Sequence, residues 1–202
     1  MSLGLCGVVL AAGQSSRMGR DKALLPWPKN AQPGTLLSSA IQSLSDCCDL
    51  VVVVTGANED ILRPVVDRCG ATLVRNSAPE RGQFSSLQTG LQEVLNRGRD
   101  AAMVTLVDRP PPRATTLMTL VDTFANRTHE AWAVVPEFES KHGHPIVIGR
   151  QMIEAFLRAP ATSNAREVTH ANHSHILYLA VDDRQVTMNV DTPQDYASLE
   201  SK

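Results

Sequence analysis

The sequence contains few aromatic residues and carries almost no net charge. Phe, Trp and Tyr make up 4% of its 202 residues, which is too few for a surface that stacks the bases of a single-stranded nucleic acid. The formal net charge is −2 and the pI is about 6.3. This balance argues against a nucleic-acid binder or a protein held on an anionic membrane. We therefore expect small-molecule partners, with any phosphate bound by a local cluster of charges.

The sequence also lacks a long hydrophobic run and paired cysteines. The apolar start at residues 3–12 is far shorter than the roughly 20 residues of a transmembrane helix, and no basic region precedes it as in a secretory signal. The four cysteines form no CxxC pair. These features predict a cytoplasmic protein with reduced thiols and no membrane segment.

Three familiar motifs are missing. A Walker A loop needs four residues between its glycines and a lysine directly after the second. Here five residues separate Gly13 from Gly19, and Arg20 follows. The dinucleotide pattern GxGxxG is absent, because Ser15 stands two places after Gly13. No GxSxG nucleophile elbow occurs either.

The most informative stretch is residues 5–22, LCGVVLAAGQSSRMGRDK. Its Val-rich start predicts a buried strand, and the small residues that follow allow a backbone to approach a ligand closely. Arg17, Arg20 and Lys22 then supply positive charge. A strand that leads into such a loop suits a polyphosphate, which needs N–H groups and cations. The alternative is an ordinary turn with solvated basic residues.

Strand and helix patterns alternate along the chain. Strands are expected at residues 5–10, 50–55, 71–74, 101–107, 131–136, 145–148 and 176–181. Helices are expected at residues 36–44, 58–68, 82–96, 115–125, 151–158, 164–170 and 193–199. This alternation predicts the α/β class: a single Rossmann-like domain at residues 1–202, with a doubly wound, mostly parallel sheet and helices on both faces. Ligands of such sheets bind at the carboxyl ends of the strands.

The string LAAGQSSRMGRDK at residues 10–22 resembles the signature LAAGxSxRMGxxK of the MobA-like nucleotidyltransferases. Among these it is most similar to the molybdenum cofactor cytidylyltransferases. The resemblance implies a nucleotide-diphospho-sugar-transferase-like fold. It also implies CTP rather than GTP as substrate, because guanylyl-transferring relatives carry LAGG where this chain has LAAG. The nucleotide-binding residues that it implies here are Leu10, Ala11, Ala12, Gly13, Ser15, Arg17 and Lys22.

Two aspartates are candidate metal ligands. Asp108 follows an apolar run and precedes Arg109 and Pro110, and a carboxylate at the end of a strand can hold Mg²⁺. The alternative is a capping residue beside a proline turn. The family has a metal-binding GDxP motif here, in which this chain replaces Gly by Val107 and places the unusual Arg109 after the aspartate. Asp191 resembles the second metal-side carboxylate of the family segment NxDTPxD. On position alone Asp191 is a helix N-cap.

Two further segments resemble those of the cytidylyltransferases. NSAPERGQFSSL at residues 76–87 resembles NPxWxxGMxSSL, so Gly82, Ser85 and Ser86 are expected to bind nucleotide, although the two serines could simply cap a helix. His142, Gly143, His144 and Pro145 resemble a segment near the acceptor substrate. A zinc site at the two histidines is disfavoured, because no cysteine or fourth ligand lies nearby.

The resemblance, taken with these residues, implies a Mg²⁺-dependent nucleotidyltransferase that transfers CMP from CTP to molybdopterin and releases pyrophosphate. Arg17, Lys22 and Asp108 are its expected catalytic residues, and Asp108 with Asp191 its metal ligands. The resemblance also implies transient contact with a molybdoenzyme. Three alternatives stay open: transfer to another phosphorylated acceptor such as a sugar phosphate, an NAD(P)H-dependent reductase, and a non-catalytic nucleotide-binding protein.

Overall fold

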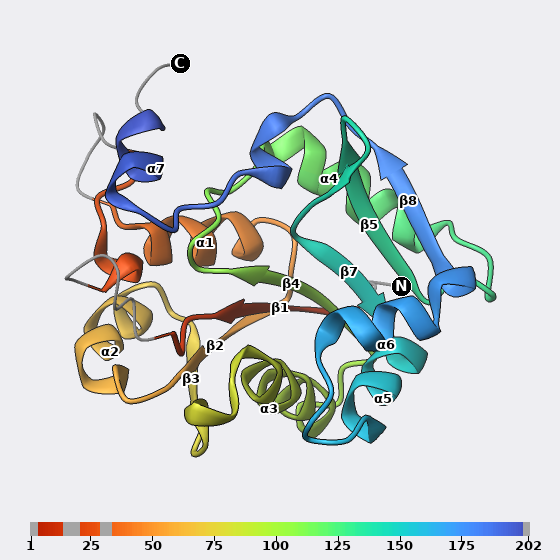
Figure 1. Cartoon of the computed structure of the whole chain (residues 1–202), viewed down its shortest axis with the longest axis horizontal. Coiled ribbons are helices and arrows are strands. Elements are labelled where there is room, and N and C mark those ends of the chain that lie inside the picture. The colour runs from red at the N-terminus through yellow and green to blue at the C-terminus, as the bar shows by residue number, and fades with distance from the viewer. Residues whose placement is uncertain (1–3, 14–20, 29–33, 200–202) are drawn as a thin grey trace.

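A mixed, mostly parallel sheet forms the centre of the computed structural model, which describes residues 4–13, 21–28 and 34–199 (Figure 1). Its eight described strands follow the order β3-β2-β1-β4-β7-β5-β6, and β8 pairs with β5. The strands are β1 (Leu5–Leu10), β2 (Leu50–Thr55), β3 (Thr72–Arg75), β4 (Ala101–Leu106), β5 (Ala133–Phe138), β6 (Lys141–His142), β7 (Ile146–Gly149) and β8 (Ile176–Ala180). Antiparallel pairing occurs where β7 meets β4 and β5, and between β5 and β6. The predicted fold class is confirmed.

Helices cover both faces of this sheet (Figure 1). One face packs against α1 (Leu36–Ser45), α2 (Glu59–Arg68) and α4 (Ala114–Ala125), and the other against α3 (Gln83–Asn96), α5 (Arg150–Arg158) and α6 (Ala165–Ala171). Strand β1 is buried along its whole length because its side chains point alternately to the two faces of the sheet. Val9 packs in the core under α1, α2 and α4, and Val8 packs in the core under α3, α5 and α6. Each such buried aliphatic side chain contributes about 1.5–3 kcal/mol.

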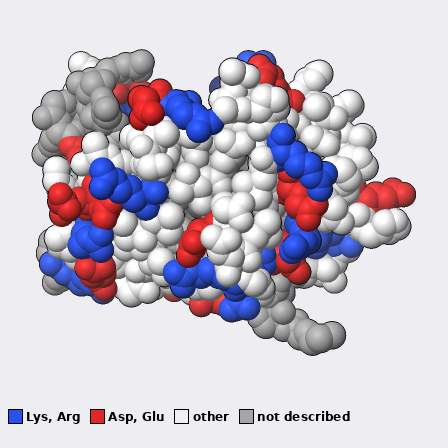
Figure 2. Space-filling model, turned by 90° about the horizontal axis from the view of Figure 1, so that it is seen from below, with Lys and Arg blue, Asp and Glu red and all other residues white. Residues whose placement is uncertain are grey.

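Charged side chains of both signs are interleaved on the side of the molecule where α3 and α5 lie (Figure 2). Neighbouring residues on these helices form ion pairs, such as Arg97 with Glu93 and Arg158 with Glu154. None of the described helices is long and apolar enough to cross a membrane.

The helix α7 (Pro193–Ser198) packs beside residues 25–28, which follow the loop after β1. This loop, between Leu10 and Lys22, is called the first loop. Leu25, Leu36 and Val190 form a small buried cluster, and the Tyr196 hydroxyl donates to the Pro26 carbonyl at 2.7 Å. Thr192, not Asp191, caps this helix. Asp191 itself lies between the 3₁₀ helix η5 (Arg184–Thr187) and α7.

Candidate functional site

The carboxyl ends of β1 and β4 meet at one edge of the sheet. The two strands pair in parallel, and just beyond them the Val107 amide donates to the Leu10 carbonyl at 3.1 Å. Ala11, which follows β1, donates its amide to the Val54 carbonyl of β2 at 2.8 Å. Asp108 and the start of the small-residue loop therefore lie at the same edge.

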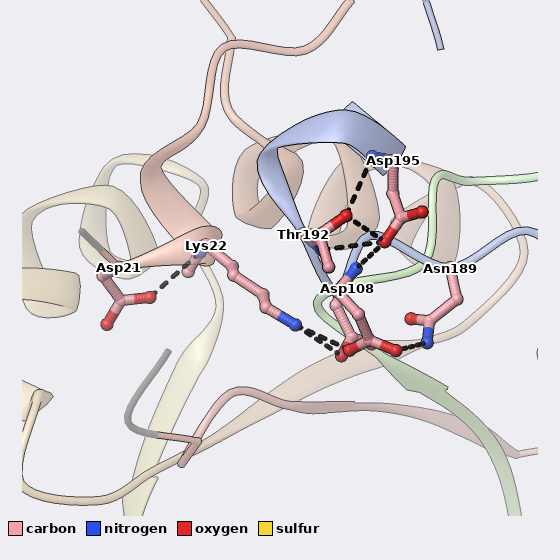
Figure 3. Close-up of polar contacts among 8 residues, drawn as sticks. Asp21, Lys22, Asp108, Asn189, Thr192 and Asp195 are labelled. Carbon is pink, nitrogen blue, oxygen red and sulfur yellow. Dashed lines mark hydrogen bonds and ion pairs between the residues drawn. The ribbon is translucent and has the colours of Figure 1, made fainter. Parts of the chain in front are cut away.

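Lys22 and Asp108 point toward each other at this edge (Figure 3), and Lys22 also forms an ion pair with Asp191. We call these three residues the acidic corner. The Lys22 Nζ lies 2.8 Å from Asp191 Oδ1 and 3.7 Å from Asp108 Oδ2. The Lys22 side chain is only 13% exposed, so water screens these attractions weakly. The Val190 amide donates to the Asp108 carbonyl at 2.9 Å, which ties the two carboxylate segments together although they are far apart in the sequence.

The cap of α7 fixes the backbone that carries Asp191. Thr192 and Asp195 form a capping box, in which the Thr192 side chain accepts from the Asp195 amide. The Asp195 carboxylate in turn accepts from the Thr192 hydroxyl and from the amides of Thr192 and Asp191. These hydrogen bonds, led by that of the hydroxyl, lower the pKa of Asp195. Asp191 therefore has no capping role and points its carboxylate to Lys22.

Burial dominates the electrostatics of Asp108. Desolvation raises its pKa, the charges of Lys22 and Arg109 oppose the shift, and Asp191 adds to it. Its Oδ1 atom is buried and has no hydrogen-bond partner among the described residues. A buried carboxylate oxygen without a donor, next to a second carboxylate, is suited to a cation.

Two neighbouring carboxylates are a donor set that suits a hard divalent cation such as Mg²⁺ or Mn²⁺. The described residues contain no group of three or more His, Cys, Asp or Glu side chains that could hold a metal. Mg²⁺ is commonly held by one or two carboxylates, with substrate phosphates and waters as its other ligands. Asp108 and Asp191 match that pattern, whereas a zinc site at His142 and His144 gains no support.

Asn58 connects the two described ends of the first loop. Its amide nitrogen donates to the Ala11 carbonyl at 2.9 Å and to Asp21 Oδ2 at 2.7 Å, and its Oδ1 accepts from the Gly56 amide. Asp21 Oδ1 caps the short helix η2 (Lys22–Leu24) through the Ala23 amide. The sequence suggested only that Asn58 opens a helix, so its contact with the loop was missed.

The start of α3 approaches the same edge. Gly82 adopts a positive φ of 88°, a backbone conformation that would be strained in a residue with a side chain. Buried Asn76 donates to the hydroxyls of Ser85 and Ser86 at 2.8 and 3.0 Å, and the Ser85 hydroxyl donates to the Gly82 carbonyl. The two serines therefore hold the turn rather than cap α3, whose N-cap is Gly82 without a side-chain bond.

A small pocket of about 450 Å³ lies between the first loop and the start of α3. Its described lining consists mainly of short side chains and backbone. The lining residues are Leu10, Ala12, Gly13, Pro79, Glu80, Gly82, Gln83 and Ser86. Five of the expected nucleotide-binding residues thus surround one hollow, while Ala11, Lys22 and Ser85 are not part of its lining. Ser15 and Arg17 lie outside the described residues.

A large pocket of about 860 Å³ adjoins the small one, since both are lined by Leu10, Gly82 and Gln83. The expected acceptor residues His142, Gly143 and His144 line it. Pro145 instead lines a minor hollow next to Arg109 and Leu117.

Gly143 allows the wall of this pocket to pack tightly on η5. A Cβ at Gly143 would lie 2.6 Å from the Val186 carbonyl oxygen, and the adjacent His144 amide donates to that oxygen at 2.8 Å. Burial, aided by the charge of Arg109, lowers the pKa of His144 to about 3. His144 is therefore neutral at physiological pH, whereas exposed His142 stacks on Tyr178 at 4.2 Å between ring centroids.

Comparison with known proteins explains this architecture. A sequence model of the MobA-like NTP transferase domain matches residues 7–176, most of the chain. The protein belongs to the MobA-like NTP transferase family. The match confirms the expected family and covers the acidic corner as far as Asp108, but it ends before Asp191.

Individual relatives agree with this assignment. The molybdenum cofactor cytidylyltransferase of Escherichia coli is 23% identical over 198 residues, which cover 96% of this chain and 95% of that protein. A probable molybdenum cofactor guanylyltransferase of Mycobacterium avium is 36% identical over 109 residues, about half of each chain. The chain is thus an enzyme, a nucleotidyltransferase, with MobA-like relatives of both base preferences.

A solved structure gives the same picture. Rv0371c of Mycobacterium tuberculosis superimposes with a TM-score of 0.83 at 26% identity, with both chains fully covered. A second crystal structure of Rv0371c is a complex with manganese. A divalent cation is therefore bound by a structural neighbour of this MobA-like fold.

Proposed function

We propose that this nucleotidyltransferase transfers CMP from CTP to the phosphate of molybdopterin and releases pyrophosphate. The observation that carries the proposal is the convergence of Lys22, Asp108 and Asp191 at the edge of the sheet where β1 ends in Leu10, a residue that lines both pockets. Transfer between two phosphates needs a nucleotide site and an acceptor site on either side of one charged centre.

The small pocket is the proposed nucleotide site. Its wall of Ala12, Gly13 and Gly82 leaves backbone groups near the ligand. Lys22, together with Arg17, would neutralise the triphosphate. Ser86 lines the hollow, and the Asn76 amide that donates to it also donates to Ser85. The methyl group of Ala12 takes up room that a glycine would leave, which favours a pyrimidine over the larger guanine.

Asp108 and Asp191 are the proposed ligands of Mg²⁺. The ion supplies charge neutralisation to the phosphates when it is bound. The unpartnered Oδ1 of Asp108 supports this assignment. The Lys22 ammonium contacts both carboxylates and offsets part of their charge.

The large pocket, with His142, Gly143 and His144 in its wall and Pro145 beside it, is the proposed acceptor site. An oxygen of the acceptor phosphate attacks the α-phosphorus, and the bond from that phosphorus to the β-phosphate oxygen breaks. A phosphate monoester is already ionised near neutral pH, so the reaction needs no general base. Neutral His144 fits this requirement, since it offers a hydrogen-bonding group without adding a charge.

Pyrophosphate release with purified molybdopterin tests the proposal. We expect Mg²⁺-dependent release with CTP and slower release with GTP, and none above background in Asp108→Asn. Faster turnover with GTP would overturn the base assignment, and turnover with sugar phosphates but not molybdopterin would overturn the acceptor. No release with any triphosphate would contradict the transferase mechanism at this site.

A further inference from the structure

Arg109 is a half-buried cation with unused hydrogen-bond donors. It directly follows Asp108 beyond β4. Its Nε is buried and has no partner among the described residues. Its Nη1 makes one long contact, 3.5 Å from the Val186 carbonyl oxygen. A guanidinium carries five donors in a rigid fork and always keeps its charge, so burying it this way is costly unless a ligand completes the set.

The local charges do not pair with Arg109. No carboxylate oxygen of the described residues forms an ion pair with it within 4.0 Å, although Asp108 and Asp191 are close enough to stabilise its charge. Desolvation is the larger influence on the guanidinium and lowers its pKa. The nearest aspartates are instead engaged by Lys22. The fork of Arg109 is thus left for an anion from outside the chain.

Arg109 lines the large pocket, whose composition indicates the class of ligand. Three of its described lining residues are arginines, Arg81, Arg109 and Arg166, and none is Asp or Glu. Most of the remaining wall is apolar or aromatic: Leu10, Phe84, Leu87, Val104, Leu106, Val135, Ile146, Phe156, Ile176 and Tyr178. Such a pocket suits an anionic group attached to a larger, less polar body.

The position of Arg109 next to Asp108 indicates where in the pocket the anion binds. Asp108 faces the acidic corner and the next residue faces the pocket, so the proposed metal ligand and the unpaired guanidinium belong to adjacent residues. Arg81 and Arg166 come from η3 (Pro79–Arg81) and α6, on other parts of the wall. Of the three arginines, Arg109 alone directly follows a residue of the corner.

We infer that Arg109 binds the phosphate monoester of the acceptor, with the fork of Nε and Nη on two phosphate oxygens, and holds it beside the acidic corner. This inference rests on the proposed function for the reaction, but concerns a residue that sets acceptor specificity. Acceptors that end in a phosphate bind through Arg109, and analogues without the phosphate do not. A lysine at this position keeps the charge but loses the fork.

Steady-state kinetics at saturating Mg²⁺, in which the acceptor and CTP are varied in turn while the other is saturating, test this inference. We expect Arg109→Gln to raise the acceptor KM at least tenfold and to leave the KM for CTP within twofold, with Arg109→Lys in between. The matched control is Arg68→Gln, which removes an equal charge from an exposed position at the end of α2 and should behave as wild type. A raised KM for CTP with an unchanged acceptor KM would overturn the inference, as would no change in either.

A binding measurement separates the inference from the proposed function. Phenyl phosphate serves as the probe and phenol as its uncharged partner, each titrated by calorimetry into the whole protein. We expect wild type and Arg68→Gln to bind phenyl phosphate at least tenfold more tightly than Arg109→Gln, and no variant to prefer phenol. Equal affinity in all three proteins, or no binding by wild type, would overturn the inference. Arg109-dependent binding without molybdopterin turnover would overturn the proposed function alone.

Discussion

The two adjoining pockets are built from different kinds of residue. The small pocket is formed by short side chains and turns, with Ala12, Gly13 and Ser86 in its wall. The large pocket places three arginine side chains against an apolar surface. The first recognises a ligand by letting the backbone come close, and the second by charge carried on long side chains. Substitutions in the two pockets should therefore separate nucleotide binding from acceptor binding, whereas substitutions of the two carboxylates at the acidic corner, whose residues line neither pocket, should affect the reaction itself.

Asp108→Asn should have the largest effect, because it affects the centre that serves both pockets. We expect turnover to fall about 10³-fold, as when one group that stabilises transition-state charge is removed. CTP affinity should change far less. Steady-state kinetics and calorimetry measure the two quantities, and turnover within a few-fold of wild type would show that Asp108 does not hold the metal.

The same substitution should stabilise the folded protein at neutral pH. Burial raises the pKa of Asp108, so its contribution to stability is greatest below the unfolded pKa and is lost as pH rises through the folded value. The uncharged amide of the variant carries no such penalty, and we expect a gain of about 1 kcal/mol at pH 7. This gain should vanish below about pH 3.9, the ordinary pKa of aspartate. A gain that is independent of pH in denaturant titrations would contradict this account.

Asp183→Ala should weaken the wall of the large pocket. Asp183 is 2% exposed and accepts hydrogen bonds from the Thr116 hydroxyl at 2.7 Å and from the Arg113 amide at 2.8 Å. It joins α4 to η5, whose Val186 carbonyl contacts both His144 and Arg109. Its removal leaves buried donors unpaired, and we expect a loss of about 3 kcal/mol in the free energy of unfolding. At a temperature where the variant is folded, the KM for the acceptor should rise more than the KM for CTP. A larger rise in the KM for CTP would contradict the division between the two pockets.

Lys22→Ala should affect the nucleotide side. Its ammonium contacts both carboxylates and is the proposed partner of the triphosphate. Because hydrogen bonds to charged groups contribute about 1.5–3 kcal/mol, CTP affinity measured by calorimetry should fall tenfold or more, while phenyl phosphate affinity stays unchanged. An unchanged CTP affinity would count against the expected role of the first loop.

Ala12→Gly should have the smallest effect, and that effect should be a shift in base preference from CTP toward GTP. Removing the methyl group enlarges the small pocket, so the preference for CTP over GTP should drop about fivefold, which is the low end of the roughly 1–3 kcal/mol that one methylene in a pocket is worth. The ratio of the two kcat/KM values measures this change. An unaltered ratio would mean that Ala12 does not select the base.

The two stretches that line the small pocket, at residues 10–13 and 79–86, both carried a signal in the sequence, because each is short and local. The run from Leu5 to Gly13 combines a strand pattern with small residues, and that local chemistry determines both the turn and the hollow. The order of strands and helices followed from periodicity for the same reason. Strand ends were shifted by a residue or two, and the two-residue strand β6 was missed because it is too short for a pattern.

The other half of the site depends on contacts between distant segments. Asn58 reaches Asp21 across 37 positions, and Asp183 reaches Thr116 across 67. Nothing in the local sequence of either residue signals such a partner. Arg109 stood out as unusual beside Asp108, but its lack of a carboxylate partner among the described residues and its place in an arginine-lined pocket became visible only in three dimensions.

Thermal unfolding of wild type and Asp108→Asn with CTP, GTP, ATP, UTP and NADPH, each with and without Mg²⁺, tests the central claim most directly. A ligand at about 100 times its dissociation constant adds about 2.7 kcal/mol, which is readily seen. The account predicts a shift with CTP that Mg²⁺ enlarges in wild type but not in Asp108→Asn, where CTP itself still binds. A shift with NADPH, a shift with CTP that Mg²⁺ does not enlarge in wild type or enlarges equally in the variant, or no shift with any triphosphate would contradict a metal-assisted nucleotide site at the acidic corner.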